Sequence, residues 1–385
     1  MKFKAQHAPQ GRLRKASTAV ALAATVTLML GACAGGVVGT ESDDAEGEVF
    51  EFTLATGAAV GTPNAAVQEW YLDEIEAATA GRIVFDRTAP ESLCKAAEVV
   101  DCVRDGRAQI GVTIPDYTPQ YFPTVSVVGI PFLGQNSQAI MASFADLHNN
   151  YAPAKALMTE NGLHHVATWP VGRFLLGSNE EITSVEGLAG LQVRASGPVV
   201  QQVLSDTGVS IAAITASETY EAVERGVVDS VGGAIDFPVN YRLMELLPYW
   251  TDPGIGQYSS FGMWFSVEAY ESLPDDLAAI VDDVTNTLNS GAGIAAFNDV
   301  AAGQCQQLLD ATTVKGVTAW TEESTSQWSA EIGSSAEARW LEIASEYNID
   351  DPAALLAEYK AGLSKYADAE YVDATIDCVD QFASR

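Results

Sequence analysis

A short strand pattern that ends in an arginine is the feature that most constrains the fold of this chain. The residues Leu-Gln-Val-Arg end at Arg194, and a turn of Ser, Gly and Pro follows at positions 196–198. In an open α/β sheet, ligands bind in the crevice beyond the carboxyl ends of the strands. The planar guanidinium of arginine matches a carboxylate with two hydrogen bonds. The pattern therefore predicts a carboxylate site at the edge of a sheet.

The order of strand and helix patterns favours an α/β fold with two lobes. Residues 49–56 alternate like a strand, residues 65–80 have the spacing of an amphipathic helix, and residues 109–114 form another strand pattern. Such alternation predicts sheets flanked by helices, and 385 residues are many for one core. Residues 101–110 and 221–230 faintly repeat a helix end, a glycine and a strand. Two similar lobes explain this repeat, although glycine is common after any helix.

The last third of the chain is predicted to be mostly helical. A long helix is expected from residue 274 towards residue 309, with an interruption at the Gly-Ala-Gly of residues 291–293. Further helices are expected at residues 328–347 and 353–366. The α/β lobes are therefore followed by a helical C-terminus.

The first 32 residues have the pattern of a lipoprotein signal peptide. Five basic residues and no acid precede an apolar run at residues 16–30, which is too short to span a membrane. The run ends Leu-Gly-Ala-Cys, which predicts cleavage before Cys33 and acylation of its thiol. An ordinary signal peptide with a chance cysteine is the alternative. Residues 33–48 are rich in Gly, Ser, Asp and Glu and are expected to form a flexible tether.

The charge of the chain excludes some classes of partner. Loss of the signal peptide takes the formal net charge from −31 to −36. Nucleic-acid binding needs basic surface that displaces counterions, and adhesion to an anionic membrane needs the same sign of charge. We therefore expect no nucleic-acid partner, and contact with the membrane through the lipid anchor alone.

Four cysteines remain after Cys33, and in an exported protein an even number suggests disulfides. Of the three possible pairings we favour Cys94 with Cys102 and Cys305 with Cys378, the second of which ties the C-terminal tail to the long helix. A zinc site is the alternative, but no Cys-x-x-Cys or neighbouring His supports it. No metal and no cofactor are expected.

The sequence contains no recognisable catalytic arrangement. Nucleophile elbows, zinc-protease motifs and phosphate-binding loops are missing from the printed sequence. His164 and His165 are adjacent in a strand pattern, so that at most one of them faces a cleft. The chain is therefore not expected to be an enzyme.

An ordered set of short segments resembles the TRAP transporter solute-binding proteins of the DctP type. The pattern G-L-x-G-L-x-V-R ends at Arg194, and S-E-T-Y-E-A-V-E-x-G-V-V-D ends at Asp229. Four further segments fit in order, namely A-A-T-A-G-R-I-V-F, D-G-R-A-Q-I-G-V, V-V-G-I-P-F-L and A-Y-E-S-L-P-D-D-L. The resemblance covers roughly residues 49–309. Each segment alone is weak, whereas the ordered set is specific.

The resemblance implies a two-lobed α/β fold like that of periplasmic binding proteins of class II type, with the lobes linked by strands and a long helix. It divides the chain into two lobes, each built from two segments. Lobe I is expected at residues 49–170 with about 254–295, and lobe II with the C-terminal helices at residues 171–253 with about 296–385.

The resemblance also implies roles for two arginines. Arg194 matches the family's carboxylate-binding arginine, and Arg173, at the start of the second lobe, matches a second one that many members keep. An ion pair with one of the chain's many acids is the alternative for each. The family pattern favours ligand contact for both.

One wall of the expected cleft departs from the family pattern. The family often has Asn shortly after Val-Asp-Gly, whereas here Gly232 or Gly233 stands at that position. The residues expected to line the cleft are Asn64 and Tyr117 from the first lobe and Asp236 and Phe237 from the second. A helix cap at Asn64, loop packing at Tyr117 and core packing at Phe237 are the alternatives.

The function that follows is that of an extracytoplasmic receptor anchored to the cell membrane by lipid. It is expected to bind a small organic acid between its lobes and to deliver it to the membrane permease of a TRAP transporter. A secreted enzyme that acts on carboxylates, or a receptor for a signalling partner, are the alternatives.

Overall fold

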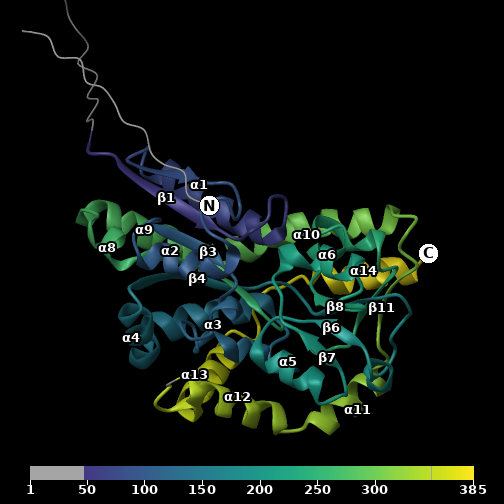
Figure 1. Cartoon of the computed structure of the whole chain (residues 1–385). Helices are drawn as coiled ribbons and strands as arrows, with labels where there is room; N and C mark the ends of the chain where they lie inside the picture. The colour runs from purple at the N-terminus through teal and green to yellow at the C-terminus, as the bar shows by residue number, and fades with distance from the viewer. Residues whose placement is uncertain (1–46, 348) are drawn as a thin grey trace, which may run out of the picture. The chain divides into compact units, whose positions relative to one another are not determined.

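The computed structural model describes residues 47–347 and 349–385 (Figure 1). The predicted signal peptide, Cys33 and most of the predicted tether lie outside the described residues. Among the described residues, no helix is both long enough and apolar enough to cross a bilayer.

Five strands form the sheet of the first lobe, in the spatial order β2, β1, β3, β10 and β4. β1 pairs in parallel with β2 and β3, whereas β10 runs antiparallel to β3 and β4. Along β1 the side chains of Phe52 and Leu54 are buried, as the alternating pattern predicts. The strands are β1 Phe50–Thr56, β2 Ile83–Arg87, β3 Ile110–Thr113, β4 Leu163–Pro170 and β10 Ser260–Ser266. The flanking helices are α1 Pro63–Ala78, α2 Val99–Arg104, α3 Ser137–Asn150, α4 Ala152–Glu160, α8 Val267–Glu271 and α9 Asp275–Thr287.

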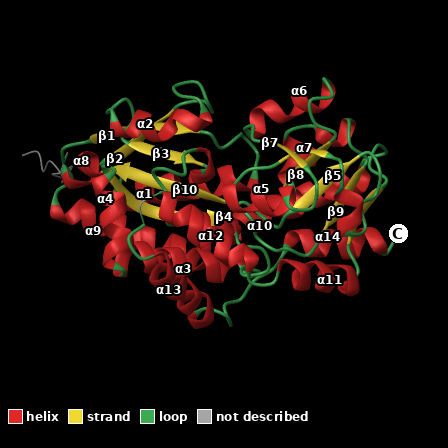
Figure 2. Cartoon of the chain, turned by 60° about the horizontal axis from the view of Figure 1, so that its bottom comes forward, coloured by secondary structure: helices red, strands yellow, loops and turns green. Residues whose placement is uncertain are grey.

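Six strands form the sheet of the second lobe, in the order β11, β9, β5, β8, β6 and β7. β6 is parallel to β7 and β8, whereas β5 is antiparallel to β8 and β9. The strands are β5 Leu175–Ser178, β6 Gln192–Arg194, β7 Ser210–Ala212, β8 Ser230–Gly233, β9 Tyr249–Asp252 and β11 Gly316–Ala319. The helices of this lobe are α5 Pro198–Ser205, α6 Thr219–Glu224 and α7 Asp236–Asn240. Figure 2 shows the two sheets side by side, which confirms the predicted two-lobed α/β fold.

Two extended segments connect the lobes, one from β4 to β5 and the other from β9 to β10. They run beside each other, because the amide of Val171 donates to the carbonyl of Ser259 at 3.1 Å and the amide of Phe174 donates to that of Gly256 at 3.0 Å. Between these bonds Arg173 and Gln257 form an antiparallel bridge. This pair of segments is the hinge between the lobes.

One long helical run forms a third connection. α9 passes through a π-helical turn, Leu288–Ala292, into α10, Gly293–Asp310. The interruption lies at Gly291, whose φ of 142° disfavours any side chain. The predicted long helix and its break are therefore present. α10 packs on α1 of the first lobe and lies between the two sheets in Figure 2.

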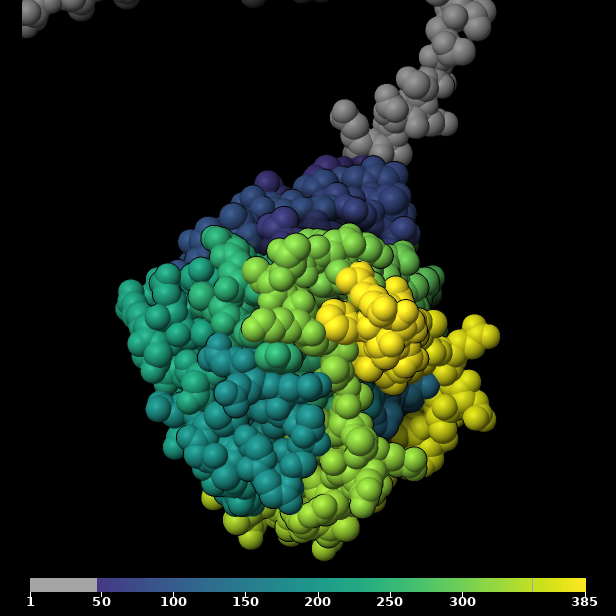
Figure 3. Space-filling model, turned by 90° about the vertical axis from the view of Figure 1, so that its right-hand side faces the viewer, coloured from purple at the N-terminus to yellow at the C-terminus, as the bar shows by residue number. Residues whose placement is uncertain are grey.

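The C-terminal helices divide between the lobes. They are α11 Glu322–Ile332, α12 Ser335–Glu346, α13 Pro352–Lys365 and α14 Ala374–Ala383. The single helix predicted over residues 328–347 is broken at Gly333, which has a φ of 50°. α13 packs against α3 of the first lobe and not with the second lobe as we expected, while α14 packs on α10 and β11. In Figure 3 the yellow C-terminal residues lie next to light-green residues on the visible face.

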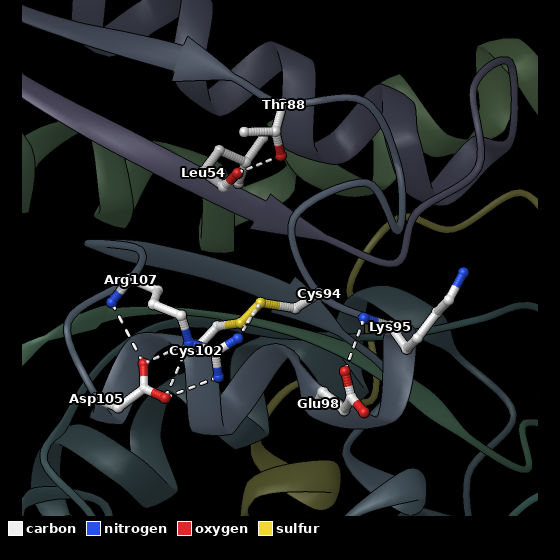
Figure 4. Close-up of a disulfide and its surroundings, with 8 residues drawn as sticks. All are labelled: Leu54, Thr88, Cys94, Lys95, Glu98, Cys102, Asp105 and Arg107. Carbon is white, nitrogen blue, oxygen red and sulfur yellow. Dashed lines mark hydrogen bonds and ion pairs between the residues drawn. A yellow bond between two sulfur atoms is a disulfide. The ribbon is translucent and has the colours of Figure 1, made fainter. Parts of the chain in front are cut away.

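Both predicted disulfides are present. Cys94 is bonded to Cys102 within the first lobe, with Cα atoms 6.6 Å apart, and Arg107 donates to the sulfur of Cys94 at 3.3 Å (Figure 4). Cys305 of α10 is bonded to Cys378 of α14, with Cα atoms 5.4 Å apart. The second bond holds the C-terminal helix on the helix that joins the lobes.

Candidate ligand-binding site

Arg194 ends β6 and is completely buried between the lobes. Its Nε donates to the carbonyl of Ile214 and its Nη1 to that of Gly232, each at 3.0 Å. Its Nη2 lies 3.5 Å from the hydroxyl of Tyr117 in the first lobe. A guanidinium has five N–H donors, so that two remain for another acceptor.

The charge of Arg194 has no direct counter-charge. None of the ion pairs within residues 47–347 and 349–385 includes this guanidinium, so no carboxylate oxygen of the described chain lies within 4.0 Å of it. An unpaired buried charge is costly to the fold, whereas a ligand carboxylate would both neutralise it and take the two free donors.

The ring of Phe237, in the first turn of α7, covers the guanidinium at 4.8 Å from centroid to Cζ. The ring occupies the space next to Gly233, where any Cβ would overlap it. Position 232 is equally crowded, because a Cβ there would meet the ring of Phe174 at 2.7 Å. The family's asparagine is therefore excluded sterically from either glycine position, and an aromatic wall stands in its place.

Asp236 adds a buried carboxyl to the same wall. The residue is 4% exposed, and its Oδ1 has no hydrogen-bond partner. Burial raises the pKa of Asp236 to about 7, and backbone N–H groups, the Arg194 charge and the Asn64 amide offset only part of this rise. This carboxyl therefore holds a proton for part of the time near neutral pH.

Asn64 reaches the site from α1 of the first lobe. The helix is capped by Thr62, whose hydroxyl accepts from the amide of Ala65 at 3.1 Å, so that Asn64 is not the cap. Instead its side-chain oxygen accepts from the indole of Trp169 at 3.1 Å. Since Trp169 belongs to β4, close to the hinge, this bond fixes Asn64 beside Asp236.

Tyr117 and Asp116 close the site from the opposite side, in the turn that follows β3. The hydroxyl of Tyr117 accepts from the amide of Ala216 at 3.0 Å and so bridges the lobes. Asp116 is partly buried and accepts from the hydroxyl of Ser259 at 2.5 Å. Burial raises the pKa of Asp116 to about 6, against the opposing effects of Ser259 and the Arg194 charge.

Asp116 was not among the residues predicted from the sequence. It also lies against Gly197, where a Cβ would come within 3.0 Å of its Oδ2. The available signal was its place directly after a buried strand, at the carboxyl edge where Arg194 also ends its own strand.

A cavity of about 240 Å³ is lined from both lobes. This is somewhat below the range of roughly 300–1,000 Å³ typical of small-molecule sites. Of the side chains described above, Tyr117 belongs to its wall, whereas Arg194, Asp236 and Phe237 lie behind that wall. Tyr241 also belongs to the wall and packs on Phe237 with ring centroids 5.0 Å apart. The rest of its lining is Gly57, Ala59, Pro90, Glu91, Ala96, Thr113, Ile114, Ala216, Ser217 and Phe261.

The sequence profile of the bacterial extracellular solute-binding protein family 7, DctP, matches residues 54–341. The chain belongs to this family. The matched region contains most of both lobes, the hinge and every residue of the site described above, so that the resemblance noted in the sequence is confirmed.

Curated relatives of this family 7 protein are distant. The ectoine-binding periplasmic protein TeaA of Halomonas elongata is 22% identical over 193 residues, which are 49% of this chain and 56% of that protein. A monocarboxylate 2-oxoacid-binding periplasmic protein of Nostoc sp. is 27% identical over 222 residues, 55% of this chain and 58% of that protein. The chain thus spans about half the length of the curated relatives it matches.

Solved structures share the fold of the family 7 protein. A TRAP solute-binding protein from a marine metagenome, described as specific for aromatic acids and bound to 3-hydroxybenzoate, superposes with a TM-score of 0.74 at 22% identity. The match covers 83% of this chain and 99% of that one.

Five of the six predicted site residues of the family 7 protein come together, but Arg173 does not join them. Its Nε donates to Asp252 and its Nη1 donates to Gln135 at 2.7 Å, and Asp373 lies 3.8 Å away. The guanidinium of Arg173 therefore forms an ion pair at the hinge. An ion pair with an acidic residue was the alternative to ligand contact that we gave for this arginine. Within the described residues no group of three or more His, Cys, Asp or Glu is arranged to hold a metal.

Proposed function

We propose that this protein is an extracytoplasmic receptor that binds a small organic carboxylate between its lobes, with Arg194 as the carboxylate partner. The observation that carries the proposal is the fully buried guanidinium with two unused donors and no ion pair among the described residues. Asn64, Tyr117, Asp236 and Phe237 line the ligand, and the lobes close over it. Closure excludes water and strengthens the charged contact.

The relatives support a ligand of this class. The relatives described above bind ectoine, 2-oxoacid monocarboxylates and an aromatic acid, all of which carry a carboxylate. The family and these relatives are described as solute-binding proteins, which favours a receptor over a carboxylate-processing enzyme. Delivery to the membrane permease of a TRAP transporter follows from the same comparison.

The lipid anchor is a separate part of the proposal. Its support is the Leu-Gly-Ala-Cys segment after a basic and apolar leader, and the two disulfides suit an exported protein. Cys33→Ser should abolish acylation and membrane retention and leave the folded part unchanged. Intact mass and detergent partition measure this, and a soluble, unmodified wild-type protein in its own host would contradict it.

Arg194 gives the direct test of ligand binding. A thermal-shift screen against organic acids identifies binders, since an acid at one hundred times its Kd adds about 2.7 kcal/mol of stability. Loss of a desolvated charged partner costs on the order of 2–5 kcal/mol, so Arg194→Ala should weaken binding roughly a hundredfold to a thousandfold by calorimetry. Arg194→Lys keeps the charge without the planar fork and should also weaken binding. An Arg194→Ala protein that binds like wild type would place the carboxylate elsewhere.

A further inference from the structure

The site contains more negative than positive charge. Among the described residues, Arg194 is the one cation whose charge acts on the carboxyls of Asp116 and Asp236, although neither carboxyl lies within 4.0 Å of its guanidinium. Glu91 adds a third acid in the lining of the cavity, and its nearest cation is Lys95 at 3.9 Å. A simple carboxylate ligand would bring a further negative charge into this enclosed space.

We propose that the ligand is a zwitterion, whose carboxylate binds Arg194 and whose cationic group lies against Asp236. This inference rests on the proposed function and specifies the class of ligand. It follows from the unpartnered Oδ1 of a carboxyl that is 4% exposed, beside a guanidinium that already needs an anion. One molecule that carries both charges satisfies both groups at once.

The walls beside Asp236 suit a cation. Phe237 and Tyr241 present aromatic rings there, and rings attract ammonium groups through their negative faces. Tyr258 also lies within electrostatic range of Asp236 and is 2% exposed. Of the groups that favour the ionised form of Asp236, Arg194 carries a positive charge, whereas the backbone N–H groups and the Asn64 amide carry none.

A simple carboxylate could also bind if protons neutralised the carboxyls of the site. The carboxyls can take up protons, because burial raises the pKa of Asp236 to about 7 and that of Asp116 to about 6. Binding of a simple acid would then draw protons from the solution and weaken as the pH rises. Binding of a zwitterion would favour the ionised form of Asp236, so that near pH 7 it would release protons and would not take them up. The two ligand classes therefore differ in a measurable way.

The experiment uses pairs of acids that have nearly the same shape and differ in one positive charge. The pairs are glycine betaine with 3,3-dimethylbutyrate, proline with cyclopentanecarboxylate, and pipecolate with cyclohexanecarboxylate. Calorimetry at pH 8 should show the zwitterion of the best-binding pair at least tenfold tighter than its partner. At pH 7, in buffers of different ionisation enthalpy, the simple acid should take up protons and the zwitterion should not.

Asp236→Asn tests the assignment of the cationic subsite. The variant should weaken the zwitterion at least tenfold and strengthen the matched simple acid, because one negative charge is removed without a change of shape. Asp206→Asn is the matched control, since Asp206 is exposed at the C-terminal end of α5 and its side chain accepts from Gln202 at 3.0 Å. It should change neither affinity.

The outcomes separate this inference from the proposed function. Simple acids that bind at pH 8 as tightly as their zwitterionic partners, lose affinity in Arg194→Ala and are unaffected by Asp236→Asn would overturn the inference and leave the carboxylate receptor intact. If no acid of either kind shows binding that depends on Arg194, the proposed function fails and the inference fails with it.

Discussion

The ring of Phe237 lies over the guanidinium of Arg194, 4.8 Å from its Cζ, in the space that a side chain at position 233 would need. The two residues come from different elements, α7 and β6, and are brought together by β8, which ends at Gly233. The absence of a side chain at position 233 is thus a condition for the contact. The departure from the family pattern and the aromatic cover of the arginine are one structural feature.

Gly233→Ala should therefore disturb the site by overpacking. Its Cβ would overlap the Phe237 ring, and inserting a carbon into a packed core typically costs about 1–3 kcal/mol of unfolding free energy. Urea unfolding measures this, and ligand affinity should fall as the ring moves. Gly303→Ala is the control, because Gly303 lies in α10 with nothing within 4 Å of the added Cβ, and alanine there should be neutral or stabilising by up to about 1 kcal/mol. Equal effects of the two changes would contradict the overlap.

Arg173→Met should affect stability more than ligand recognition. The variant leaves Asp252, which is 3% exposed, without its partner at the hinge, and loss of one member of a buried pair costs about 3–5 kcal/mol. Arg173→Lys should retain much of this stability. Thermal unfolding of the ligand-free protein measures both variants. A normal melting temperature with lost binding would instead assign Arg173 to the ligand, as the family resemblance implies.

The stability of the ligand-free protein should depend on pH through Asp236. Burial raises the pKa of this carboxyl to about 7, above the ordinary 3.8, so that the native state keeps a proton that the unfolded state releases. Its stabilising contribution is full below pH 3.8 and is lost as the pH rises through 7. The loss between pH 5 and pH 8 is about 2–3 kcal/mol.

Asp236→Asn removes this loss and should be more stable than the wild type at pH 8, with a smaller difference at pH 5. Urea unfolding at the two pH values gives the difference between variant and wild type, in which the contributions of other groups cancel. This comparison matters because burial lowers the pKa of His148 to about 3 and also lowers that of His165, which acts in the opposite direction below pH 6.5. A stability difference that is the same at both pH values would show that Asp236 is not buried in the ligand-free protein.

The sequence alone determined the features that depend on local patterns. Short stretches of neighbouring residues predicted three such features. They are the strand that ends at Arg194, the break of the long helix at Gly291 and the order of the family segments. The pairing of Cys305 with Cys378 was predicted as one of three possible pairings, and the structure confirms it. A glycine such as Gly291 marks a position where the chain can adopt a positive φ without steric cost.

Only the tertiary structure decided which charges meet. The sequence assigned the same role, contact with a ligand carboxylate, to Arg173 and Arg194. In the structure Asp252 and Asp373 approach Arg173 from distant parts of the chain. The guanidinium of Arg194 instead contacts carbonyls, a hydroxyl and an aromatic ring. The protonation of Asp236 likewise depends on burial, which no neighbour in sequence specifies. Electrostatic roles arise from distance and from exclusion of water, and both are properties of the folded chain.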